Sequence, residues 1–66
     1  MDKAYLRYKM ETQGVSKEDL IKTMDWGTST YQRKVYGDAD WRLTEMRILV
    51  DLLELTQDEI MLIFFS

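Results

Sequence analysis

The sequence contains no cysteine, no histidine and no proline, and each absence removes a class of structure or function. Without cysteine there is no disulfide framework, no thiolate nucleophile and no redox motif. Without histidine as well, there is no zinc-finger ligand set and no imidazole base. Paired carboxylates alone do not make a mechanism, so the sequence predicts a protein that is not an enzyme and uses no cofactor or metal ion.

Long apolar runs are also missing. The longest covers residues 60–65, which is six residues, whereas a helix that spans a bilayer needs about 20. No basic segment followed by an apolar stretch indicates a secretory signal. We therefore expect a soluble cytoplasmic protein that does not enter a membrane, with a single domain over residues 1–66. A chain this short buries only about 60% of the surface that it exposes when unfolded, so its core is small.

Positive charge is scarce overall but unevenly distributed. The net charge is -3 and the pI is about 4.7, which ordinarily argues against a nucleic-acid partner. Residues 1–37, however, carry seven basic and five acidic residues, a sum of +2, whereas residues 38–66 carry two basic and seven acidic residues, a sum of -5. This asymmetry predicts that one face meets an anionic partner and that another does not.

Apolar residues recur at spacings of three and four, which predicts an all-α protein. Breaks fall at Gly14, at residues 25–27 and 37–40, and near Leu55. Ser16 with Asp19, and Thr56 with Glu59, have the spacing of capping boxes. Five helices are expected. The first begins near Asp2 and buries Leu6 and Met10, the second follows Ser16 and buries Leu20, Ile21 and Met24, and the third covers about Thr28 to Tyr36 and buries Tyr31 and Val35. The fourth covers about Arg42 to Leu53 and buries Met46, Leu49, Val50 and Leu53, and the fifth follows Thr56 and buries Ile60, Ile63 and Phe64.

The segment LIKTMDWGTSTYQRKVYG, residues 20–37, is the most specific stretch of the chain. Two short helices separated by a three-residue break, the second beginning with small polar residues, are what a helix-turn-helix requires. Gln32 can make a bidentate contact to adenine and Arg33 one to guanine, each worth about 1–3 kcal/mol of discrimination. Short hydroxyls at residues 28–30 allow the helix N-terminus, whose free N–H groups favour phosphate, to approach DNA.

On these residues the sequence resembles the Cro and lambda-repressor-like (XRE-type) helix-turn-helix family, especially its small phage-encoded members. The apolar and glycine positions of the family pattern are taken by Leu20, Met24, Trp26, Tyr31 and Gly37, and segments 14–16 and 45–56 extend the likeness. The resemblance implies a five-helix domain with a helix-turn-helix formed by its second and third helices. Such a domain binds operator DNA as a transcription regulator in the bacterial cytoplasm, where it is nucleoid-associated when bound.

The resemblance also assigns residues. It places Thr28, Ser29, Gln32 and Arg33 at base-reading positions and Lys17 at a phosphate contact, and Thr30, Lys34, Tyr36 and Arg42 are further candidates for the DNA backbone. Asp25 stands at the turn glycine, where a positive φ is common, and Gly27 stands at the usual serine cap. Met10 and Val35 stand where the family often pairs arginine with glutamate, which predicts that these two side chains are in contact.

Alternatives remain at several of these positions. Isolated lysines such as Lys17, Lys22 and Lys34 are often plain solvated surface, and residues 28–30 can merely cap a helix. The apolar C-terminal run suggests a homodimer interface, or else a tail that completes the core; its candidate residues are Met61, Leu62, Phe64 and Phe65. The main rival function is a protein-interaction module, an antirepressor or corepressor that binds a phage repressor through the acidic fourth and fifth helices or the apolar tail. A helical domain without any nucleic-acid role is a third reading.

Overall fold

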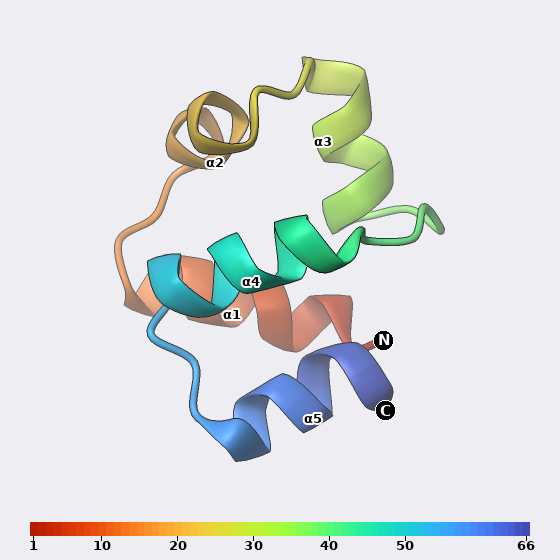
Figure 1. Cartoon of the computed structure of the whole chain (residues 1–66). Helices are drawn as coiled ribbons and strands as arrows, with labels where there is room; N and C mark the ends of the chain where they lie inside the picture. The colour runs from red at the N-terminus through yellow and green to blue at the C-terminus, as the bar shows by residue number, and fades with distance from the viewer.

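The computed structural model describes all 66 residues and contains five helices and no strand, which confirms the all-α prediction (Figure 1). The helices are α1 (Lys3–Thr12), α2 (Lys17–Met24), α3 (Thr28–Val35), α4 (Leu43–Leu52) and α5 (Gln57–Phe65). The third helix ends one residue earlier than expected, with Tyr36 as its C-cap, and Arg42 and Leu53 cap α4 instead of belonging to it. None of these helices combines the length and the apolar character that a membrane crossing requires.

Local capping explains where most helices begin. The Asp19 N–H donates to Ser16 Oγ at 3.1 Å and the Ser16 N–H donates to Asp19 Oδ2 at 3.0 Å, which confirms the predicted capping box at α2. Hydrogen bonds that the Asp19 carboxylate accepts from Ser16, chiefly the one from the Ser16 backbone N–H, lower the pKa of Asp19. The box of Thr56 and Glu59 at α5 is confirmed in the same way. By contrast, the N-cap of α3 is Gly27, which has no side chain to accept a hydrogen bond, so the first N–H groups of α3 are left without an internal side-chain acceptor.

Left-handed residues end several helices. Gly14, Asp25 and Glu54 have φ of 69°, 57° and 51°. The positive φ implied for Asp25 is therefore confirmed, and it allows the Trp26 N–H to donate to the Ile21 carbonyl at 3.0 Å, which closes α2. Gly37 is needed for a different reason, because a Cβ there would lie 3.1 Å from backbone atoms of Arg33.

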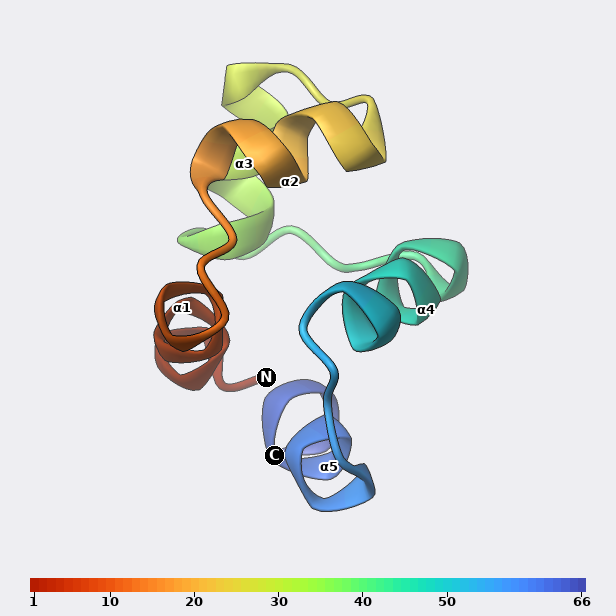
Figure 2. The same cartoon turned by 90° about the vertical axis from the view of Figure 1, so that its left-hand side faces the viewer.

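The ten buried residues are all apolar or aromatic and form one cluster. They are Leu6, Met10, Leu20, Tyr31, Val35, Trp41, Leu49, Leu53, Leu55 and Ile63. Within the molecule α1 packs against α3 and α5, and α2 packs against α3. In both views α2 and α3 form one end, α5 forms the other, and α1 and α4 lie between them (Figures 1 and 2). Met10 and Val35 are both buried in this core, and their direct contact stays a prediction.

Candidate nucleic-acid interface

One face of α3 is exposed and polar. Tyr31 and Val35 are buried against the core, whereas Thr28, Ser29, Gln32 and Arg33 are exposed. At 3.6 residues per turn these four side chains occupy an arc of roughly 140°. None of them makes a hydrogen bond or an ion pair within the protein, so their donors and acceptors remain available to a partner.

Two basic side chains of α1 hold the C-terminal end of α3. The Lys3 ammonium donates to the carbonyls of Gly37, Ala39 (3.2 Å) and Arg33 (3.4 Å), and Arg7 Nη1 donates to the Val35 carbonyl at 3.0 Å. Burial lowers the pKa of Lys3, although nearby carboxylates oppose that effect. Cations are stabilising at this pole of a helix. Neither residue had a predicted role, and their i, i+4 spacing on the first helix is the only signal in the sequence.

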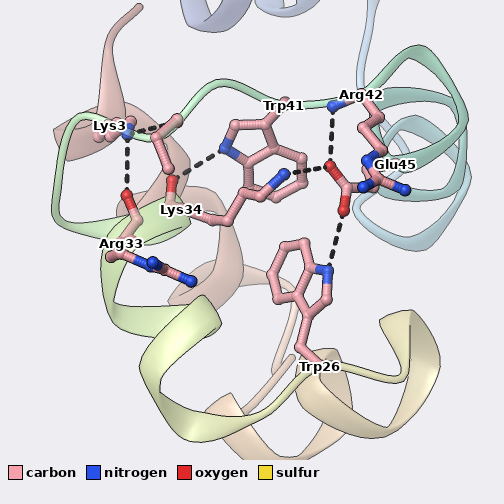
Figure 3. Close-up of polar contacts among 8 residues, drawn as sticks. Lys3, Trp26, Arg33, Lys34, Trp41, Arg42 and Glu45 are labelled. Carbon is pink, nitrogen blue, oxygen red and sulfur yellow. Dashed lines mark hydrogen bonds and ion pairs between the residues drawn. The ribbon is translucent and has the colours of Figure 1, made fainter.

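On the α4 side of α3, the carboxylate of Glu45 joins three elements (Figure 3). It accepts from Trp26 Nε1 at 2.9 Å, from the Lys34 ammonium at 2.7 Å, and from the backbone N–H of Arg42 at 2.7 Å. Burial alone would raise the pKa of Glu45, but these hydrogen bonds outweigh it and the pKa is lowered. The first turn of α4 is thereby fixed to α3 and to the turn between α2 and α3.

The structure separates the neighbouring residues Arg33 and Lys34. The Lys34 side chain is only 12% exposed, its ammonium pairs with Glu45, and its carbonyl accepts from Trp41 Nε1 at 2.8 Å. Arg33 takes part in this region only through its carbonyl, which accepts from Lys3 (Figure 3). Of the two adjacent cations predicted to meet DNA, Arg33 is free and Lys34 is already paired.

Beyond Lys34, the same flank of α3 holds Thr30 and Arg42. Thr30 is half-buried and Arg42 is exposed. Together with Arg33 they line one shallow hollow, to which Asp25 and Glu45 also contribute carboxylates. Two of the predicted phosphate contacts therefore lie side by side with the base-reading candidate Arg33.

The other flank carries a row of four side chains, two cations around two tyrosines. Lys17 Nζ lies 5.8 Å from the centre of the Tyr31 ring, the Tyr31 and Tyr36 rings are 6.4 Å apart in an edge-to-face arrangement, and Arg7 Cζ lies 4.6 Å from the centre of the Tyr36 ring. Burial raises the pKa of Tyr31, and its neighbours Tyr36 and Glu18 add to that shift. Lys17 and Tyr36, both predicted phosphate contacts, are thus brought to one side of α3.

The α5 end of the molecule is apolar and acidic. Met61, Leu62 and Phe65 are 55%, 40% and 66% exposed, as expected for residues that the core cannot cover. The fourth candidate for a dimer interface, Phe64, points inward and packs on Trp41 with ring centres 6.0 Å apart. Three residues therefore form an exposed apolar patch, and Phe64 belongs to the packing beneath it.

Comparisons with known proteins add no relative from which function could be transferred. No family model matches the chain, and neither does any curated protein or solved structure. The structure has no group of three or more acidic side chains arranged to hold a metal ion. Function is therefore inferred from the exposed face of α3 and from the cations on its two flanks.

Proposed function

We propose that the protein is a sequence-specific DNA-binding transcription regulator that inserts α3 into the major groove of an operator. The observation that carries this proposal is the exposed face of α3, where hydroxyl, amide and guanidinium groups have no internal partners. In this proposal α2, the turn at residues 25–27 and α3 form a helix-turn-helix. The resemblance to the Cro and lambda-repressor-like family supports the same reading.

The side chains then divide by role. Arg33 and Gln32 read bases, and Thr28 and Ser29 approach base edges near the uncapped start of α3. Lys17 and Tyr36 on one flank, and Thr30 and Arg42 on the other, contact the DNA backbone. Lys34 was a candidate for the same task, but its pairing with Glu45 favours a role in positioning α3 instead.

The acidic composition is compatible with this proposal because part of it lies away from α3. Asp58 and Glu59 belong to α5, which forms the opposite end of the molecule in both views (Figures 1 and 2). The surplus of acids still weakens the overall attraction to DNA. We therefore expect weak non-specific binding and a larger share of affinity from direct contacts by α3.

Selection from a random duplex library, followed by titration of the selected site, tests the proposal. Arg33→Ala should relax the base preference at one position by about 1–3 kcal/mol, whereas Lys17→Ala should weaken all sequences alike and reduce the salt slope by about 1. Arg47→Ala is the matched control, since Arg47 is an exposed arginine of α4. Equal losses for every sequence with Arg33→Ala would contradict its base-reading role, and no duplex binding by the wild type at low salt would refute the proposed function.

The exposed patch of Met61, Leu62 and Phe65 favours a second candidate, a protein interface. We propose a homodimer through this patch, since two-fold symmetry would match a palindromic operator. Sedimentation over a wide concentration range tests it, with Phe65→Ser expected to shift the equilibrium to monomer. A wild type that is monomeric throughout would exclude the dimer. A wild-type protein that does not bind DNA but binds a phage repressor would instead be an antirepressor or corepressor of the same fold.

A further inference from the structure

An open concavity lies where α1, the start of α2 and α3 meet. Its lining includes both cations of the four-residue row, Arg7 and Lys17, together with Tyr31 and Tyr36. Glu11 is the single carboxylate in the lining. We call this concavity the Arg7 notch. It lies beside α3, because Tyr31 of that helix and its exposed C-cap Tyr36 both line it.

Arg7 is held in place within the protein and has further N–H donors that bind nothing within it. One of its five N–H donors goes to the Val35 carbonyl, and its guanidinium lies over the Tyr36 ring. A planar guanidinium already held in this way loses little freedom when it binds an oxyanion with its remaining N–H groups. Lys17 adds a second cation, whose ammonium lies near Tyr31 and has no ion pair within the protein.

We infer that the Arg7 notch binds a backbone phosphate of the DNA strand that runs beside α3, with Arg7 as a direct ligand and Lys17 as its neighbour. This inference rests on the proposed function and extends the DNA-contacting surface to α1. Arginine suits phosphate because its planar fork of donors matches two oxygens at once. Glu11 opposes the bound anion from the same lining. Arg7 also donates to the Val35 carbonyl, so the same side chain binds the phosphate and holds the C-terminal end of α3.

The test is a titration of a fluorescein-labelled duplex, followed by anisotropy between 50 and 200 mM salt, with wild type and three variants. Arg7→Gln removes the cation and should reduce the salt slope by about 0.9, so that its affinity relative to wild type changes about 3.5-fold over that range. Glu11→Gln removes the opposing carboxylate and should tighten binding about twofold at low salt for every sequence. Asp58→Asn makes the same change in net charge on α5, outside the lining of the Arg7 notch, and should have a smaller effect than Glu11→Gln.

The outcomes separate this inference from the proposed function. If the wild type does not bind the duplex at 50 mM salt, the proposed function fails and the notch has no DNA to bind. If the wild type binds but a folded Arg7→Gln variant keeps the full salt slope, the inference alone is overturned. Should Arg7→Gln fail to fold, Glu11→Gln decides the matter, because Glu11 is exposed and makes no hydrogen bond or ion pair through its side chain. Equal effects of Glu11→Gln and Asp58→Asn would also overturn the inference, since only overall charge would then count.

Discussion

Two glutamates perform the same structural task in different helices, Glu45 in α4 and Glu59 in α5. Each is the third residue of its helix and accepts the backbone N–H of the helix cap, which is Arg42 for Glu45 and Thr56 for Glu59. Each also accepts from one aromatic donor and one lysine. Glu45 takes Trp26 and Lys34, and Glu59 takes Tyr5 Oη at 2.8 Å and Lys9 Nζ at 3.0 Å.

The difference lies in what each glutamate connects. Tyr5 and Lys9 both belong to α1, so Glu59 only joins α5 to one neighbouring helix. Trp26 lies in the turn before α3 and Lys34 lies in α3 itself, so Glu45 joins α4 to two parts of the proposed DNA-binding unit. One motif therefore stabilises the fold at Glu59, and at Glu45 it also sets the position of the exposed helix. Matched substitutions at the two sites test that distinction.

Glu45→Ala should have the largest effect. It removes three hydrogen bonds and leaves the mostly buried Lys34 ammonium unpaired, at a cost of about 3 kcal/mol. That is a large fraction of the roughly 3–10 kcal/mol expected for a chain of this size. Urea unfolding measures the loss, and duplex titration in the folded range should show weaker binding. Glu59→Ala is the matched control and should leave duplex affinity unchanged; an equal loss of affinity would contradict the distinction.

Lys34→Met should follow, with a loss of about 1–2 kcal/mol, because Glu45 keeps its other two donors. Lys9→Met should cost less, since the Lys9 ammonium lies 3.0 Å from Glu59 Oε2, whereas that of Lys34 lies 2.7 Å from Glu45 Oε1. Thermal unfolding compares the two. The salt slope of duplex binding should be unchanged by Lys34→Met, and a decrease of about 1 would show that Lys34 contacts phosphate after all.

Acid should reveal the contribution of Glu59. Hydrogen bonds from Thr56, Tyr5 and Lys9 lower the pKa of Glu59 from 4.5 to about 2. A lowered pKa stabilises the fold above about pH 4.5, and this contribution is lost as the pH falls towards 2. The Tm difference between wild type and Glu59→Gln, followed by circular dichroism at stepped pH, should therefore shrink over that window. A Tm difference that stays constant over this pH window would show that the charge of Glu59 does not contribute to stability.

The smallest effects should come from the two aromatic donors. Trp26→Phe removes the 2.9 Å bond to Glu45 and should cost about 1 kcal/mol. Tyr5→Phe removes only a hydroxyl that bonds to Glu59, and its effect should be smaller. Urea unfolding of both variants measures the pair. A larger loss of stability for Tyr5→Phe would contradict the expectation that the contacts of Glu45 contribute more to stability than those of Glu59.

The sequence predicted those features that depend on nearby residues. The capping boxes of Ser16 with Asp19 and of Thr56 with Glu59 each join residues three apart, so their spacing is visible in the chain. The left-handed turn at Asp25 is local in the same sense. The helical period also identified the buried sides of α1 and α3, where Leu6 and Tyr31 lie in the core.

The contacts between helices were beyond such patterns. Lys34 and Trp26 reach Glu45 across 11 and 19 residues, and nothing in the sequence marks these pairs before the helices pack. The capping role of Glu45 was missed because the residue three before it is Arg42, whose side chain is no hydrogen-bond acceptor. Lys34 was predicted to contact DNA together with Arg33 because its pairing with Glu45 depends on the packing of α3 and α4, which the sequence does not show.

The packing of Trp26 on Trp41 has an optical consequence. Their rings meet edge to face, with centres 5.2 Å apart and an angle of 74°. Two indoles this close couple their electronic transitions and give an exciton couplet in the circular dichroism spectrum, which a single tryptophan cannot give. Trp26 lies in the turn before α3 and Trp41 precedes α4, so the signal reports whether those two segments are docked. The protein thus carries an intrinsic spectroscopic probe, without any added label, at the junction on which the orientation of α3 depends.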